Sequence, residues 1–109
     1  MSFISVISET SENSDGTNNV LDAEAYKNEG NRRLKNHNDI QGSIDAYTKA
    51  IVLAKSNYVY YNNRAVPYLM LQQYDRAIAD CDTSLDLCKN VKAYCRKASA
   101  LGMMGRYEE

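Results

Sequence analysis

Five polar side chains with a regular spacing could together bind an anion. Lys27 and Asn31 are four residues apart, and Lys92 and Arg96 repeat this spacing further along the chain. Residues four apart lie on the same face of an α-helix, so each pair presents two donors side by side. Asn63 lies between the pairs in the sequence. Three cations and two amides without a carboxylate favour an anionic ligand, which the amides would orient.

Residues that could carry catalysis or bind a metal are scarce. The single histidine, His37, lies in a polar turn, and the chain has no Ser-His-Asp or Cys-His order and no glycine-rich phosphate loop. Asp80 and Asp82 flank Cys81 and are expected on the outward, charged face of a helix. Cys81 and Cys88 are expected to be small core residues. The sequence therefore predicts no enzyme activity, no cofactor and no metal site.

The composition is typical of a small globular domain. The 109 residues are 44% hydrophobic and 25% charged, and 13 Lys and Arg against 14 Asp and Glu give a net charge of −1. The sequence has neither the basic surplus that a nucleic-acid-binding surface needs nor a long apolar run that could span a membrane. Three cysteines spaced by seven form neither a disulfide framework nor a Cys-x-x-Cys metal motif. These features predict a reduced, cytoplasmic protein that binds neither nucleic acid nor a membrane.

Residues 1–21 differ in composition from the rest of the chain. Serine recurs at every third residue from Ser2 to Ser14, accompanied by Thr, Asn and Gly, and the segment contains no Lys or Arg. Such a segment buries too little apolar surface to offset the entropy lost on ordering, so we expect a flexible tail. Residues 22–109 are richer in helix formers and tyrosine and are expected to form the folded domain.

Residues 22–109 repeat with a period near 34 residues. Tyr61 and Ala65, for example, recur 33 residues later as Tyr94 and Ala98. A period of this length is typical of stacked helical hairpins. The expected N-caps are Asp22, Asn38 or Asp39, Asn57 and Asn90. Apolar residues at helical spacing predict helices near 22–36, 39–54, 57–71, 74–88 and 91–104, with a sixth starting at Tyr107.

The repeated residues resemble the tetratricopeptide repeat (TPR), in which small and aromatic residues alternate at fixed places. The matching residues are Gly30, Ser43, Tyr47, Ala50, Ala65, Tyr68, Tyr74, Ala77, Cys81 and Ser84. The resemblance covers about residues 23–109, or two and a half repeats, because the third repeat is cut short. It implies an all-α domain of hairpins stacked in a right-handed superhelix. The first helix of each hairpin would line a concave groove.

The five polar residues resemble the two-carboxylate clamp of a subset of TPR co-chaperones. In that subset, the clamp holds the C-terminal Glu-Glu-Val-Asp of cytosolic heat-shock chaperones by the two carboxylates of the final Asp. The resemblance implies that Lys27, Lys92 and Arg96 supply charge, while Asn31 and Asn63 orient the peptide. It therefore implies an adaptor for chaperones of the seventy- or ninety-kilodalton class, between which the sequence does not discriminate.

Residues further along the predicted groove are expected to contact the upstream part of the peptide. They are Val66, Met70, Ser99 and Met103, of which Val66 and Met70 could form an apolar pocket. Pro67 lacks the amide that would bond to the Asn63 carbonyl, so a kink is expected in this helix.

Two alternatives to a chaperone adaptor follow from the same residues. The chain could be the N-terminal targeting module of a larger enzyme, such as a phosphatase, ubiquitin ligase or prolyl isomerase. It could also be a TPR scaffold subunit that binds other partners. The predicted helix 91–104 lacks the partner that would cover its apolar stripe, and repeat arrays need covered ends. We therefore expect either a fragment of a longer protein or self-association through this helix.

Overall fold

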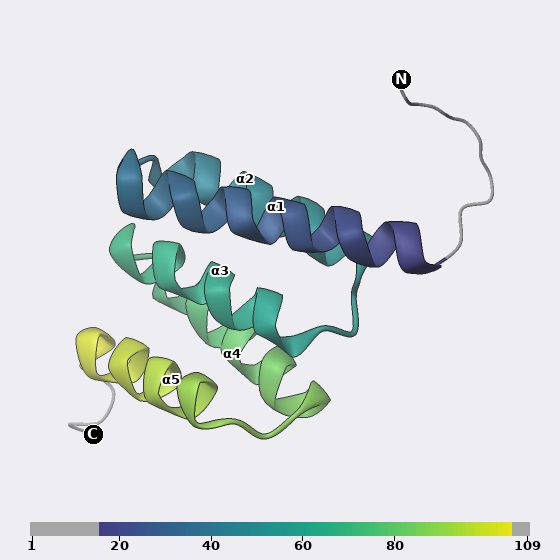
Figure 1. Cartoon of the computed structure of the whole chain (residues 1–109). Helices are drawn as coiled ribbons and strands as arrows, with labels where there is room; N and C mark the ends of the chain where they lie inside the picture. Colours follow the sequence, from purple (N-terminus) through teal and green to yellow (C-terminus); the bar gives the residue numbers. More distant parts are fainter. Residues whose placement is uncertain (1–15, 106–109) are drawn as a thin grey trace.

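The computed structural model describes residues 16–105, which form five α-helices joined by short turns (Figure 1). These residues contain no strand, so the predicted all-α fold is confirmed. The first two hairpins are α1 with α2 and α3 with α4, and α5 begins a third. The helices are α1 (Gly16–Asn36), α2 (Ile40–Leu53), α3 (Tyr58–Met70), α4 (Tyr74–Leu87) and α5 (Val91–Met104).

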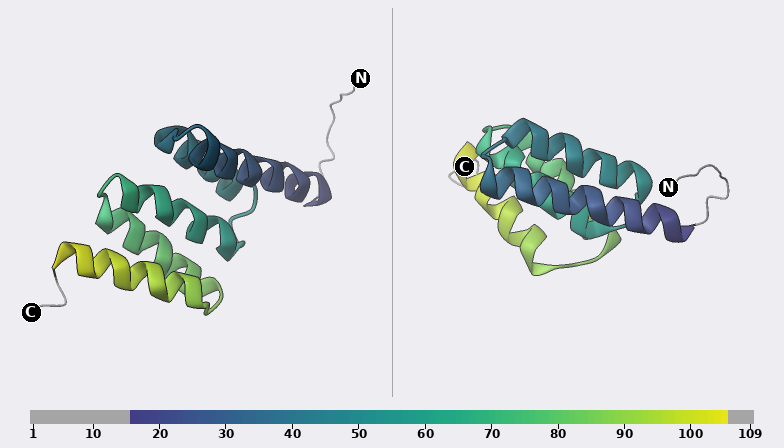
Figure 2. Two further views of the ribbon diagram at one scale, coloured as in Figure 1. Left: turned by 60° about the vertical axis from the view of Figure 1, so that its left-hand side comes forward. Right: turned by 45° about the horizontal axis from the view of Figure 1, so that its top comes forward.

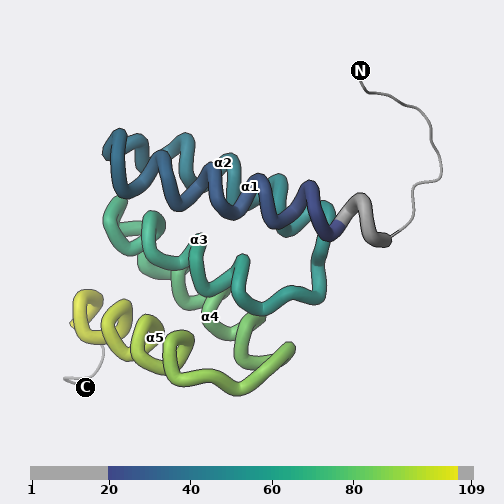
Figure 3. The backbone as a smooth tube through the Cα atoms, viewed as in Figure 1, coloured from purple at the N-terminus to yellow at the C-terminus, as the bar shows by residue number. Residues whose placement is uncertain are grey.

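The helices lie in two layers. Helices α1, α3 and α5 lie side by side, while α2 and α4 form a second layer behind them (Figures 1 and 2). Each helix packs against the next one along the chain, and α3 also contacts α1 and α5. The backbone tube shows the same stepwise path from hairpin to hairpin (Figure 3). The first helices of successive hairpins therefore share one side of the stack, as a repeat array requires.

Side-chain caps set the starts of three helices where the sequence predicts them. Asp39 accepts a hydrogen bond from Gly42 N at 2.9 Å, and Asn57 and Asn90 cap α3 and α5 in the same way. These oxygens satisfy amides in the first turn that have no partner within the helix. The bounds of α2 to α5 lie within one residue of the predicted ones.

The start of α1 differs from the prediction. The helix begins at Gly16 rather than near residue 22, so Asp22 lies inside it and is not an N-cap. Residues 16–21, which were expected in the flexible tail, belong to this helix, although Val20 and Leu21 are 58% and 64% exposed. Each added residue of a nucleated helix gains one hydrogen bond, so a helix can extend beyond its packed part. The rest of the predicted tail and the predicted sixth helix lie outside the described residues.

Small residues let the helices approach closely. Between the first hairpin and α3, Ala23 and Ala50 pack with Ile51 and Tyr60. A second cluster joins α3, α4 and α5 through the small side chains of Ala65, Ala77, Cys81 and Ala93. Helices α1 and α2 approach closely at Gly30, where an added Cβ would lie 2.5 Å from the ring of Tyr47. The small and aromatic positions of the sequence repeat are therefore contact points between helices.

A buried ion pair connects α3 to α4 and corrects one prediction. Asp80 was expected on an outward face, but it is only 4% exposed. Its two carboxylate oxygens accept hydrogen bonds from Arg64 Nε at 2.8 Å and Nη2 at 2.7 Å. Burial raises the pKa of Asp80, and the nearby guanidinium of Arg64 opposes that rise. A buried carboxylate needs such a partner, which is why Asp80 faces α3 and not the solvent.

The cysteines differ in their surroundings. Cys81 is fully buried, as predicted, and burial raises its thiol pKa to about 11. Cys88 was expected in the core but is exposed, because α4 ends at Leu87 and Cys88 follows it in an extended conformation. Cys95 is also exposed. All three cysteines are free thiols.

Candidate functional site

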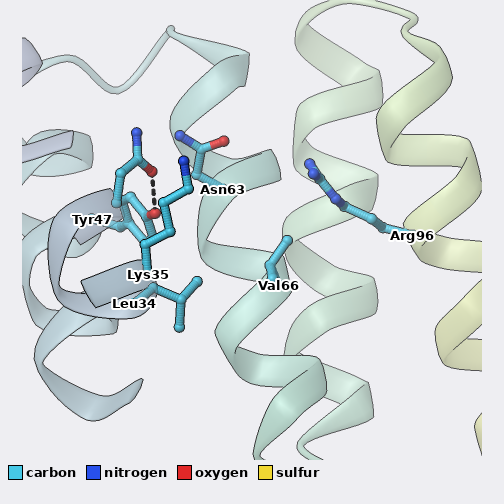
Figure 4. Close-up of a pocket in the computed structure, with 7 residues that line it drawn as sticks. Leu34, Lys35, Tyr47, Asn63, Val66 and Arg96 are labelled. Atoms are coloured by element: carbon cyan, nitrogen blue, oxygen red, sulfur yellow. Dashed lines mark hydrogen bonds between the residues drawn. The ribbon is translucent and has the colours of Figure 1, made fainter. Parts of the chain in front are cut away.

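A hollow of about 280 Å³ lies between the first helices of the three hairpins. Three of the predicted anion-binding residues line it, one from each helix: Asn31 from α1, Asn63 from α3 and Arg96 from α5. Figure 4 shows Asn63 on α3 and Arg96 extending from α5 toward the same space. The full lining is Asn31, Leu34, Lys35, Tyr47, Asn63, Val66 and Arg96.

The remaining two predicted residues, Lys92 and Lys27, do not line this hollow. Lys92 lines a neighbouring hollow of about 270 Å³ between the starts of α3 and α5. Asn63 lines both hollows, so it connects Lys92 with the first group. Lys27 lines neither of the two. The structure thus gathers Asn31, Asn63 and Arg96 directly and places Lys92 next to them.

Tyr47 fixes the orientation of the Asn31 amide. Its hydroxyl donates a hydrogen bond to Asn31 Oδ1 (Figure 4). With its oxygen occupied by this donor, Asn31 has the two N–H groups of its amide left for a ligand. Burial raises the pKa of Tyr47, and the charge of Arg96 lowers it by a smaller amount. The hydroxyl is therefore a stable donor at neutral pH, and the Asn31 amide is prepared to donate to an anion.

The position of Arg96 is fixed by the backbone of α3. Its Nη1 donates to the carbonyl oxygen of Asn62 at 3.2 Å. The Asn62 side chain in turn donates to Asn90 Oδ1 at 2.8 Å, and Asn90 is the N-cap of α5. A guanidinium has five N–H donors, so one bond to Asn62 leaves others for a ligand. Arg96 is thus a positioned cation at one wall of the hollow.

Lys27 is engaged by a carboxylate of its own helix. Its Nζ lies 2.5 Å from Glu24 Oε2, and the other oxygen of Glu24 accepts a hydrogen bond from Tyr60. The bond from Lys27, and then that from Tyr60, hold the pKa of Glu24 below its usual value. Burial and this hydrogen bond raise the pKa of Tyr60 to about 12. Because Glu24 already balances the charge of Lys27, a ligand carboxylate that binds Lys27 competes with Glu24 for its ammonium.

The hollow also contains three residues that were not predicted as part of a site, namely Leu34, Lys35 and Tyr47. Lys35 follows Asn31 by four residues, so the spacing that relates Lys27 to Asn31 also indicates it. Tyr47 was recognised only as a packing residue. No sequence signal showed that its hydroxyl would reach a polar partner, because α2 lies in the second layer.

Only one of the four residues predicted to contact the upstream part of the peptide lines the hollow. Val66 lines the hollow, whereas Met70, Ser99 and Met103 do not. Met70 and Met103 are 49% and 59% exposed and lie near the ends of their helices. The helix α3 runs unbroken through the buried Pro67, and Asn63 still lines the hollow one turn earlier.

No group of three or more His, Cys, Asp or Glu side chains within residues 16–105 could hold a metal ion. None of the helices in that same part of the chain combines the length and apolarity needed to cross a membrane.

Known structures resemble this fold closely. The TPR domain of Arabidopsis OM64 superposes with a TM-score of 0.79 and is 35% identical, covering 83% of this chain and 74% of that one. The first TPR domain of Spaghetti (RPAP3), solved with the HSP90 peptide SRMEEVD, gives a TM-score of 0.77 at 30% identity and covers 82% and 72%. The TPR2B domain of yeast Sti1 with an Hsp70 peptide gives 0.77 at 31% identity, covering 81% and 70%. The chain belongs to the tetratricopeptide repeat family.

Sequence relatives are longer proteins. Translocon at the outer membrane of chloroplasts 64 of Pisum sativum is 44% identical over 88 residues, which are 80% of this chain and 15% of that protein. Human serine/threonine-protein phosphatase 5 is 34% identical over 86 residues, or 78% of this chain and 17% of the phosphatase. The chain thus spans less than a fifth of these two relatives. No family model matches the chain.

Proposed function

We propose that this TPR domain is an adaptor that binds the acidic C-terminal peptide of heat-shock chaperones by its terminal carboxylate. The observation that carries the proposal is the hollow in which Asn31, Asn63 and Arg96 meet from three successive hairpins. The TPR domains of similar structure that were solved with HSP90 and Hsp70 peptides support it.

The proposed roles follow from the geometry. The amides of Asn31 and Asn63 donate hydrogen bonds to a carboxylate, and Arg96 supplies a planar guanidinium that can bond to two oxygens at once. Lys92 adds positive charge from the adjoining hollow. Lys27 contributes an ammonium with three N–H donors, which it shares between Glu24 and the ligand. The final Asp of the peptide carries two carboxylates, which matches a site with donors on both walls.

The expected affinity is moderate. Hydrogen bonds to charged groups contribute about 1.5–3 kcal/mol each, and ordering a flexible peptide opposes them. The remaining binding free energy is on the order of 8 kcal/mol, which corresponds to about micromolar affinity. Such an affinity suits an adaptor that exchanges its partners.

Titration calorimetry with matched peptides tests this function. The peptide SRMEEVD carries a free C-terminal carboxylate, and its C-terminal amide is otherwise identical. We expect amidation, or the substitution Arg96→Ala, to weaken binding at least about tenfold, because each removes a charged hydrogen bond. Lys49→Ala is the matched control, since it removes one positive charge from α2, outside the hollow. Equal affinities for the acid and the amide would refute the carboxylate mechanism.

We also propose that this chain supplies binding and not catalysis, whatever the whole protein does. The match to phosphatase 5 covers only 17% of that enzyme, so the same module occurs within a much larger catalytic protein. The complete coding sequence around this chain would show whether a catalytic domain accompanies it. A cytosolic location is part of the same proposal, because the clamp co-chaperones that it resembles bind cytosolic chaperones. Imaging of a fluorescent fusion tests the location.

A further inference from the structure

Two cations face the hollow without a carboxylate of their own. Lys35 and Arg96 line it from α1 and α5, and neither forms an ion pair with any residue in the described range 16–105. Other cations of the same stretch are paired: Lys27 with Glu24, Arg33 with Glu29 and Asp39, Arg64 with Asp80, and Lys97 with Asp82. Further cations of this stretch also form no ion pair, but none of them lines the hollow. The lining of the hollow thus contains two cations, Lys35 and Arg96, and no carboxylate.

Lys35 was not among the predicted clamp residues, yet its side chain extends from α1 toward Asn63 (Figure 4). Leu34 and Val66 also line the hollow and give it apolar side chains between polar ones. Lys35 and Arg96 come from the outer helices of the three-helix layer, with α3 between them, so positive charge reaches the hollow from both sides. The arrangement fits a ligand with two separated negative groups.

We infer that Lys35 is a specificity-determining residue of the peptide site. It pairs with the acidic side chain two positions before the free C-terminus, while the terminal carboxylates lie against Asn31, Asn63 and Arg96. This inference rests on the proposed function, and it adds a requirement for negative charge at one defined position of the peptide.

The spacing of residues along α1 and along an extended peptide determines which peptide side chain faces Lys35. Asn31 and Lys35 are one helical turn apart, which is about 6 Å along the axis of α1. In an extended peptide, side chains two residues apart point to the same side and are separated by about 6.6 Å. A peptide that runs along α1 with its last residue at Asn31 therefore presents the residue two places earlier to Lys35. In Glu-Glu-Val-Asp, that residue is the second Glu.

A double-mutant cycle across the interface tests the pair. Titration calorimetry measures four affinities, those of the unmodified 109-residue chain and of Lys35→Ala, each with SRMEEVD and with the peptide in which the second Glu is Gln. We expect Lys35→Ala to weaken binding of the acidic peptide about three- to fivefold, as for an exposed ion pair. The same substitution changes the affinity for the Gln peptide by less than about twofold, because the partner charge is already absent.

The controls separate a local pair from general charge and from misfolding. Lys35→Arg keeps the charge and is expected to retain most of the affinity, whereas Lys49→Ala removes a charge from α2 and is expected to affect both peptides equally and slightly. Circular dichroism confirms that each variant is folded. An equal loss for both peptides on Lys35→Ala overturns the pairing while the terminal-carboxylate site still stands. Equal binding of the acid and amide forms of SRMEEVD overturns the site itself.

Discussion

The hydroxyl of Tyr47 donates to Asn31 Oδ1 and so connects the second layer of helices to the candidate binding surface. The same ring packs against Gly30, where a Cβ atom would lie 2.5 Å from it. One buried side chain therefore sets both the spacing of α1 and α2 and the direction of the Asn31 amide. The packing of the first hairpin and the chemistry of the site are linked at this residue.

Removing the Tyr47 hydroxyl is expected to weaken ligand binding more than it weakens the fold. In Tyr47→Phe the ring still fills its place, but Asn31 loses the donor that orients its amide. A neutral hydrogen bond contributes about 0.5–1.5 kcal/mol, so we expect an affinity for SRMEEVD about two- to tenfold lower. Titration calorimetry measures it. If Tyr47→Phe binds as well as the parent chain, the orienting role is wrong.

A methyl group at Gly30 is expected to destabilise the chain. In Gly30→Ala the new Cβ overlaps the ring of Tyr47, which is only 2% exposed and has little room to move. Overpacking of this kind costs about 1–3 kcal/mol, although alanine is the better helix former. Urea unfolding followed by circular dichroism measures the change, and Ala25→Ser on the exposed side of α1 is the control. Unchanged or higher stability would contradict the predicted overlap.

Breaking the buried ion pair is expected to destabilise the second hairpin strongly. Asp80→Ala leaves the guanidinium of Arg64, whose side chain is only 18% exposed, without its carboxylate. The loss of one partner of a buried pair costs about 3–5 kcal/mol, and we expect the lower end because Arg64 keeps its hydrogen bond to Thr48. Urea unfolding provides the measurement.

A double substitution distinguishes an uncompensated charge from a simple loss of packing. The variant Arg64→Met with Asp80→Leu removes both charges and keeps apolar volume at the two positions, so it should recover much of the stability. A double variant that is no more stable than Asp80→Ala would show that the isolated guanidinium is not the cause.

The cap of α2 gives a pH dependence with a defined sign. The Gly42 amide, and then Arg33, lower the pKa of Asp39 below its usual value of 3.8. A lowered pKa in the folded state means that ionised Asp39 stabilises the fold above about pH 4, and that this contribution is lost as the pH falls through the lowered pKa. Asp39→Asn keeps a capping oxygen but removes the charge that Arg33 contacts.

We therefore expect Asp39→Asn to unfold at a lower urea concentration than the parent chain at pH 7. The difference should shrink steadily between pH 4 and pH 2, where the parent loses its own charge at this position. Asp86→Asn, an exposed change on α4, controls for the loss of one negative charge. A gap between parent and variant that is constant over the whole pH range would contradict the assignment to Asp39.

The helices could be predicted from the sequence because their signals are local. Asp39, Asn57 and Asn90 cap helices through contacts within three residues, and the small and aromatic positions repeat at a fixed period. The start of α1 could not be predicted, because Val20 and Leu21 belong to a part of the helix that extends beyond its packing partners. The composition of residues 16–21 is typical of a flexible tail, but the helix extends through them from its packed segment.

Much of the candidate site could also be predicted, since residues four apart on a helix share a face whatever the fold. The missing parts depend on contacts between helices. The polar contact of Tyr47 follows from Asn31 across the hairpin. Outside the site, the burial of Asp80 likewise follows from Arg64 on another helix. The pairing of Lys27 with Glu24 is local, because the two residues are three apart on one helix, and it could be predicted from the sequence. The bond from Tyr60 to Glu24 could not, because it joins two hairpins.

The Asn90 side chain forms hydrogen bonds to both the second and the third hairpin. Its oxygen caps α5 and accepts from Asn62, while its nitrogen donates to Ser84 Oγ and to the Cys88 carbonyl. Because Lys92 and Arg96 follow it on α5, this one asparagine connects the helix that carries both cations to α3 and to the end of α4. Loss of this asparagine would therefore loosen the start of the helix that carries both cations without removing any charge from the site.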